Sequence, residues 1–128
     1  MKYLGLDYGQ AKIGLAISEG SIASPYAVIP VNSWQLQLKN IIKKEGIDII
    51  IIGVSENKIG EETKKFAREV TKVLNIKVEL FDETLTTKEA LKSMISSGRS
   101  QKYRKEMEDA VAAAVILQGY LDNLSSRA

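Results

Sequence analysis

The chain has 128 residues, a formal net charge of +2, 45% hydrophobic residues and 27% charged residues, and this composition predicts one globular domain over residues 1–128. It contains no cysteine and no histidine, which excludes disulfides, a thiol nucleophile, a Ser-His-Asp triad and the usual Cys/His zinc site. The weakly basic balance permits a polyanionic partner without requiring one, so any nucleic-acid footprint must be local.

The same composition argues against a membrane protein. Charged residues stand near the N-terminus, where a signal peptide needs an apolar core. The longest aliphatic run, Ile49–Ile52, is far too short to span a bilayer. We therefore expect a cytoplasmic protein with no membrane partner.

The first quarter of the chain is expected to form three strands. Tyr3–Asp7 and Ile13–Ser18 are separated by a short turn, so they are expected to pair as a hairpin. Ala27–Val31 is expected to form a third strand. Pro25 and Pro30 place it at the edge of the sheet, because proline has no N–H to donate to a neighbouring strand.

The rest of the chain alternates between helices and strands. Ser33 and Gly46 have the positions of a helix N-cap and a helix C-terminal stop. The run Asp48–Val54 is almost wholly aliphatic, which is typical of a strand buried on both faces. The remaining elements are expected to be a helix over Glu61–Leu74, a strand over Lys77–Phe81, a short helix over Thr86–Ser96, a basic segment over Arg99–Lys105 and a helix over Glu106–Leu124.

This order predicts an α/β fold with a mixed five-stranded sheet and helices on both faces. Strands 1 to 3 form an antiparallel meander, and the right-handed crossover rule places strands 4 and 5 parallel to strand 1. Strand 1 is then central. Ligands of such sheets bind beyond the carboxyl ends of the central strands, so functional residues are expected there.

Two acidic positions follow strands at that edge. Asp7 ends strand 1, and Glu83 follows Asp82 after strand 5. Each has a plainer interpretation. A strand-end aspartate often accepts hydrogen bonds from its own turn, and acids before a helix are favoured by its dipole.

Asp109 is the third acidic position. Ala112, Ala113 and Ile116 share its helix face, so the carboxylate lies on a stripe expected to pack against the sheet. A buried carboxylate needs a partner or a metal ion, although Asp109 could instead be the N-cap of this helix. The small residues Ala112–Ala114 would let the helix approach the sheet closely.

Together, the three carboxylates form a candidate site with oxygen ligands only, which suits Mg²⁺ or Mn²⁺. Without a cation their charges would repel one another and raise their pKa values. Two ions roughly 3.5–4 Å apart could activate a water and hold the leaving oxygen of a phosphodiester.

Four segments form an ordered set of motifs. They are Leu4-Gly5-Leu6-Asp7-Tyr8-Gly9 with Ile13-Gly14-Leu15-Ala16-Ile17-Ser18; Gly53, Asn57 and Gly60; Asp82-Glu83-Thr84-Leu85-Thr86-Thr87; and Gly98-Arg99-Ser100 with Asp109–Ala114 and Ile116-Leu117-Gln118. This set resembles the YqgF family, which are Holliday-junction-resolvase-like proteins of the ribonuclease H superfamily. The resemblance covers nearly the whole chain.

The resemblance implies a ribonuclease H-like fold and a nuclease that matures the 5′ end of pre-16S ribosomal RNA. It also implies that Asp7, Glu83 and Asp109 are the catalytic and metal-binding acids. Three positions depart from the family pattern: Ala11-Lys12 replaces a Lys-Arg pair, Ser55 replaces a proline and Thr84 replaces an arginine. The loss of two arginines weakens phosphate binding, because neither lysine nor threonine provides a bidentate guanidinium.

Polar and basic residues near the acids are candidates for binding a nucleic-acid backbone. They are Lys12, Asn57, Lys58, Arg99, Lys102, Arg104 and Lys105. For any single lysine, a solvated surface is the plainer interpretation. Tyr8 and Tyr103 could stack on bases, or they could pack against the protein.

The leading hypothesis is a metal-dependent phosphodiesterase that acts on structured nucleic acid. Precursor ribosomal RNA is favoured over branched DNA, with the small ribosomal subunit as a further partner and a monomer or weak homodimer as the active form. A DNA junction resolvase would need two symmetric sites and therefore a dimer. A nucleotide-binding module of the actin-like ATPase type needs two such domains. A non-catalytic RNA-binding assembly factor would not depend on the three acids.

Overall fold

The structure is a computed structural model, and it describes residues 1–54, 58–82 and 107–126. Its elements are β1 (Tyr3–Tyr8), β2 (Lys12–Glu19), β3 (Ile22–Pro30), the 3₁₀ turn η1 (Val31–Ser33), α1 (Trp34–Glu45), β4 (Ile49–Val54), α2 (Lys58–Leu74), β5 (Lys77–Asp82) and α5 (Glu108–Ser126). The helix expected over Thr86–Ser96 and the basic segment Arg99–Lys105 lie outside the described residues.

The strands form one sheet in the order β3-β2-β1-β4-β5. Strand β1 is central. It pairs with β2 in antiparallel fashion and with β4 in parallel, and β5 continues the parallel half. This is the mixed sheet that the sequence predicted, with the meander on one side of β1 and the crossover units on the other.

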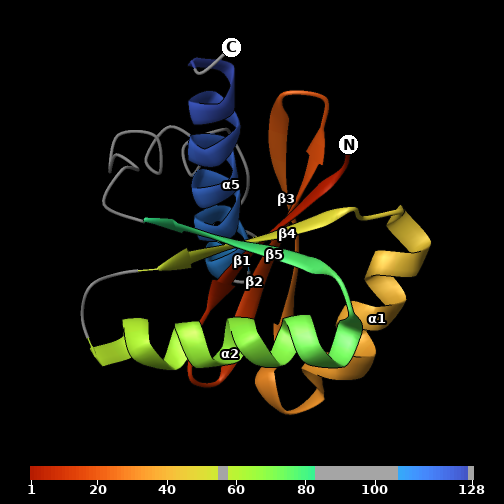
Figure 1. Cartoon of the computed structure of the whole chain (residues 1–128), viewed down its shortest axis with the longest axis vertical. Helices are drawn as coiled ribbons and strands as arrows, with labels where there is room; N and C mark the ends of the chain where they lie inside the picture. The colour runs from red at the N-terminus through yellow and green to blue at the C-terminus, as the bar shows by residue number, and fades with distance from the viewer. Residues whose placement is uncertain (55–57, 83–106, 127–128) are drawn as a thin grey trace.

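Helices cover both faces of the sheet. Figure 1 shows α5, in blue, on one side, and α1 and α2 on the other. None of the helices in the described part of the chain combines the length and apolar character that a membrane crossing requires.

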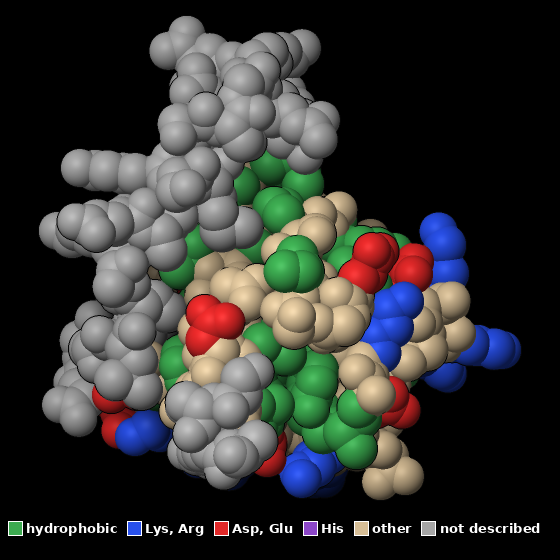
Figure 2. Space-filling model, turned by 90° about the horizontal axis from the view of Figure 1, so that it is seen from above, with side chains coloured by type: hydrophobic (Ala, Val, Ile, Leu, Met, Phe, Trp, Pro, Cys, Tyr) green, Lys and Arg blue, Asp and Glu red, His purple; other side chains and the backbone are tan. Residues whose placement is uncertain are grey.

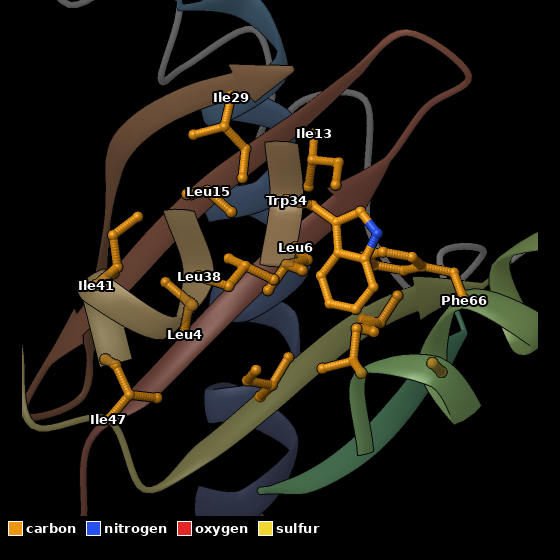
Figure 3. Packing of buried hydrophobic residues seen from close by; sticks show 14 of the residues in the cluster. Leu4, Leu6, Ile13, Leu15, Ile29, Trp34, Leu38, Ile41, Ile47 and Phe66 are labelled. Atoms are coloured by element: carbon orange, nitrogen blue, oxygen red, sulfur yellow. The ribbon is translucent and has the colours of Figure 1, made fainter. Parts of the chain in front are cut away.

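The face under α1 and α2 is packed with large side chains. Trp34 of α1 lies over Leu6 and Ile13, and the ring of Phe66 from α2 meets the Trp34 ring edge to face at 5.0 Å (Figure 3). Strand β4 serves both faces, because Ile50 and Ile52 join this cluster while Ile49 and Ile51 join the cluster under α5. The prediction of a strand buried on both faces is confirmed.

The face under α5 is packed differently. Ala16 of β2 meets Ala113, Ala114 and Leu117 of α5, and all four are fully buried. A Cβ atom added to Gly5 of β1 would lie 2.8 Å from the Cβ of Leu117. Small residues on both the helix and the strands therefore bring the α5 backbone close to the sheet.

The predicted start of the third strand was wrong. It begins at Ile22 rather than Ala27, and it ends at Pro30, because Val31 already belongs to η1. Pro25 lies inside the strand. The strand tolerates it because β3 is at the sheet edge and because the β2–β3 register shifts there, with one extra residue on β3.

The ends of the helices are only partly as expected. Gly46 ends α1 in the left-handed conformation with φ 69°, and its N–H donates to the Ile42 carbonyl, as its position predicted. Ser33 does precede α1, but its hydroxyl makes no cap hydrogen bond; it is buried without a partner among the described residues. Helix α2 begins at Lys58, three residues before the expected Glu61.

Candidate active site

Asp7 lies at the carboxyl end of the central strand. It is half-buried and is the next-to-last residue of β1. Successive side chains of a strand point to opposite faces, so Asp7 shares the α5 face with Gly5. Tyr8 lies on the other face, where its ring stacks on Phe66 at 4.3 Å. The packing interpretation of Tyr8 is therefore supported, because one face of its ring is stacked on Phe66.

Asp109 lies in the first turn of α5. The helix begins at Glu108, and the Val111 N–H donates to the Met107 carbonyl at 2.8 Å. Asp109 is thus inside the helix rather than at its N-cap position, and it is half-buried. A carboxylate in a first turn is stabilised by the partial positive charge of the helix N-terminus.

The structure brings Asp7 and Asp109 together through a glycine on β2. Gly14 is the cross-strand partner of Asp7, and such partners have Cα atoms about 4.5–5.5 Å apart and side chains on one face. A Cβ atom added to Gly14 would lie 1.8 Å from the backbone oxygen of Asp109. The start of α5 therefore rests on β2 directly beside Asp7, as the fold argument required.

Glu83, the third expected acid, lies outside the described residues. Asp82, which ends β5, is exposed and alternates to the face opposite Phe81, away from α5. Among the described residues, no group of three Asp, Glu, His or Cys side chains could hold a metal ion. The described part of the chain thus contributes two of the three proposed ligands.

The donors that are described fit a hard divalent cation. Both are carboxylates, and oxygen is the ligand that Mg²⁺ and Mn²⁺ prefer. They come from two different elements that meet on one face of the sheet, so a cation between them would relieve their mutual repulsion.

One candidate phosphate-binding residue also belongs to this face. Lys12, the first residue of β2, is exposed, and strand alternation puts it on the same face as Gly14. Lys58 is the first residue of α2. The other candidates lie outside the described residues: Asn57, Arg99, Lys102, Arg104 and Lys105.

The surface charge of the described residues is mixed. On the face shown in Figure 2, Lys and Arg side chains are interspersed with Asp and Glu side chains rather than gathered into one basic stripe. This agrees with the small net charge of +2.

The role of Gly14 is what sequence reasoning missed. The alanines of α5 were expected to let the helix approach, and Ala113 and Ala114 are indeed fully buried. The tightest approach, however, depends on the strand glycine. A glycine in a strand interior often marks a place where another backbone comes close, and this signal was present in the sequence.

Comparison with known proteins agrees with this fold and shows the family. A family model described as "RuvX: Holliday junction resolvase" matches residues 1–123. A Clostridium botulinum (strain Hall) protein named "Putative pre-16S rRNA nuclease" is 38% identical, over 98% of this chain and 99% of its own length. A Bacillus cytotoxicus protein of the same name is 35% identical, over 96% of this chain and 99% of its own length.

Solved structures show the same fold at low identity. The fowlpox virus Holliday junction resolvase has a TM-score of 0.63 at 12% identity, over 97% of this chain and 99% of that one. RuvC of T. thermophilus, solved with a Holliday junction substrate, has a TM-score of 0.60 at 13% identity, over 96% of both chains. The nearly full-length match to the family model and the 38% identity to a relative over 98% of this chain lead to one conclusion: this chain belongs to the RuvX family of Holliday junction resolvases.

Proposed function

We propose that the protein is a metal-dependent endonuclease that hydrolyses phosphodiester bonds in structured nucleic acid. The observation that carries this proposal is the juxtaposition of Asp7 and Asp109 across Gly14 at the carboxyl end of the central strand. Precursor 16S ribosomal RNA is the favoured substrate, because the relatives that match over nearly their full length are named pre-16S rRNA nucleases. The activity belongs in the cytoplasm, on or near the small ribosomal subunit.

The three acids come from different segments of the chain, and we assign one function to all of them. Asp7 and Asp109, with Glu83, would hold Mg²⁺ or Mn²⁺. The bound ions supply Lewis-acid stabilisation of the charge that develops on the phosphate. The backbone of Asp7 is fixed by the strand pairing of β1, and that of Asp109 by the docking of α5, so neither backbone segment has to be ordered when the cation binds.

Lys12 is placed to neutralise a phosphate of the substrate beside these acids. Its exposure and its position on the α5 face support this role. We assign the same role to Lys58, Arg99, Lys102, Arg104 and Lys105, and we assign to Asn57 a hydrogen bond from its side-chain amide to a phosphate oxygen. A lysine provides charge without bidentate geometry, so Lys12 contributes affinity rather than sequence selectivity.

Cleavage of branched DNA is the second candidate function. The family description and the RuvC-like fold both favour it. A resolvase must cut two strands symmetrically and therefore needs two copies of the site in one dimer. A monomer or weak homodimer fits RNA processing better.

The test combines metal binding with cleavage. Mn²⁺ is titrated by calorimetry into the wild type and into Asp7→Asn, Glu83→Gln and Asp109→Asn, and the same preparations are given a 5′-extended 16S precursor and a four-way DNA junction. We expect each substitution to abolish cleavage, with a loss of at least about 10³-fold, and to weaken Mn²⁺ binding.

Asp122→Asn is the matched control, because Asp122 is an exposed carboxylate on the same helix, where it accepts a hydrogen bond from the side chain of Gln118. It should leave Mn²⁺ binding and cleavage unchanged. The proposal is wrong if Asp7→Asn cleaves as well as the wild type. Preferred cleavage of the DNA junction by a dimer would favour the resolvase function. RNA binding that is unchanged by all three substitutions, without cleavage by the wild type, would favour a non-catalytic role.

A further inference from the structure

The strand residue opposite Asp7 has no side chain, and the start of α5 occupies the space that a side chain would fill. Gly14 lies in the interior of β2 and is buried. Gly14 is paired with Asp7 across the β1–β2 ladder, and the backbone of Asp109 lies against Gly14 on the α5 face of the sheet. Gly14 is therefore in contact with the elements that carry both described acids.

The contact is with the backbone of α5, which cannot rotate away. A Cβ atom on Gly14 would lie 1.8 Å from the carbonyl oxygen of Asp109, 2.2 Å from its carbonyl carbon and 2.9 Å from the backbone nitrogen of Ala110. The optimal van der Waals separation of non-bonded heavy atoms is about 3.5–4.0 Å. A single methyl group on Gly14 would therefore push the start of α5 away by on the order of 1.5 Å.

We propose that Gly14 is a positioning residue that sets the separation of the Asp7 and Asp109 carboxylates for binding a divalent cation. The inference rests on the proposed function of these two acids. Sites of this kind tolerate displacements of only about 0.5 Å, which is less than the shift that a methyl group would impose. Gly14 acts through Asp109 and touches neither the cation nor the substrate.

Gly5 provides a matched comparison within the same helix packing. It also lies under α5, where an added Cβ atom would meet the Leu117 Cβ at 2.8 Å and the Ala113 carbonyl oxygen at 3.1 Å. Both contacts are further along α5 than Asp109, and both overlaps are smaller. Gly5→Ala therefore requires a smaller displacement of α5 than Gly14→Ala does, and it acts at residues that lie one and two turns away from Asp109.

Gly46 provides a second control, for stability alone. It ends α1 with φ 69° and has no atom near an added Cβ. Gly46→Ala therefore lowers the melting temperature by backbone strain without displacing any neighbour.

The experiment measures Mn²⁺ affinity by calorimetry in the full chain, together with the melting temperature. We expect Gly14→Ala to weaken Mn²⁺ binding about 10- to 100-fold, the range seen when the support of a metal ligand is changed. Gly46→Ala should lower the melting temperature and keep wild-type affinity, whereas Gly5→Ala should lower the melting temperature and weaken Mn²⁺ binding by much less than Gly14→Ala does. Equal affinity in Gly14→Ala and wild type would overturn the inference.

A rescue variant separates positioning from general destabilisation. Asp109→Glu lengthens the side chain by one methylene, so it should weaken Mn²⁺ binding in the wild type. In the Gly14→Ala background the same change should strengthen binding, because it restores the reach that the displaced helix has lost. Weakening in both backgrounds would overturn the inference.

A measurement on the wild type keeps the inference testable if Gly14→Ala does not fold. Mn²⁺ broadens the NMR signals of nearby amides, so the Gly14 signal should broaden together with those of Asp7 and Ala110. A Gly14 signal that stays sharp while the other two broaden would overturn it. Absence of Mn²⁺ binding in the wild type would instead refute the proposed function itself.

Discussion

The two faces of the sheet are built from different residues. Under α1 and α2 the core contains Trp34, Phe66 and several leucines and isoleucines, whose side chains fill the space between helix and strand. Under α5 the core also contains large side chains, among them Ile51, Phe81 and Leu117, but the alanines of α5 and the strand glycines Gly5 and Gly14 let the helix backbone come close to the strands. The first arrangement buries a large apolar area. The second arrangement fixes the distance between the α5 backbone and the sheet. The candidate site lies on this second face.

This difference predicts that core truncation on the first face changes stability without changing the site. Leu38 is fully buried in α1. Leu38→Ala should lower the free energy of unfolding by about 2–5 kcal/mol, because it leaves a cavity, whereas Mn²⁺ affinity of the folded protein should stay at the wild-type value. Urea unfolding and calorimetry measure the two quantities.

Leu36→Ala is the matched control for this change. Leu36 is on the same helix and is 66% exposed, so its truncation should alter stability by less than about 0.5 kcal/mol. Loss of Mn²⁺ affinity in folded Leu38→Ala would show that the two faces are not independent.

Overpacking the second face should affect stability and the site together. Ala113 is fully buried, and its carbonyl lies over Gly5. Ala113→Leu should cost about 1–3 kcal/mol, because the helix has to move off the sheet to make room. Since Asp109 moves with the helix, Mn²⁺ affinity should fall as well. Retained affinity in folded Ala113→Leu would mean that the first turn of α5 is held independently of the rest of the helix.

The smallest expected effect is a pH dependence on the first face. Burial, followed by the hydrogen bond to Glu45 at 3.0 Å and the charge of that carboxylate, raises the pKa of Tyr26 above its ordinary value of 10.0. A raised folded pKa stabilises the protein below pH 10, and this contribution is lost as the pH rises from there through the folded pKa.

Tyr26→Phe should therefore cost about 1 kcal/mol near pH 8 and make stability fall less steeply between about pH 10 and pH 11. Urea unfolding at a series of pH values measures both effects. Glu45→Gln, which keeps a hydrogen-bond acceptor but removes the charge, should show an intermediate slope. An unchanged slope in Tyr26→Phe would assign the alkaline loss of stability to other groups.

The topology and the meeting of two acids could be predicted from the sequence because both follow from general rules. Hydrophobic periodicity gave the order of the elements, and the crossover rule then placed Asp7 on the central strand. The alanines of the last helix predicted that Asp109 approaches it. The length of β3 could not be predicted in the same way. Pro25 reads locally as an interruption, and only the edge position and the register shift of β3 make it acceptable within a strand.

How closely Asp109 approaches the strand position opposite Asp7 could not be predicted from the sequence, for a physical reason. Alanines in α5 indicate that a close approach is possible, but not which atoms meet. That depends on the register that pairs Asp7 with Gly14 and on where α5 begins, at Glu108 rather than at Glu106. A shift of a single residue in either would separate the two carboxylates.

The docking of α5 also bears on how the protein is made. The Ala23 N–H donates to the side chain of Gln118 across 95 positions of sequence, and Asp109 settles on a strand that was synthesised near the start of the chain. Contacts of such long range form late in folding, because a long loop has to close first. During translation the sheet can be complete while its two aspartates are still apart. The protein therefore cannot bring Asp109 to its place beside the strand residue opposite Asp7 until its last helix has left the ribosome.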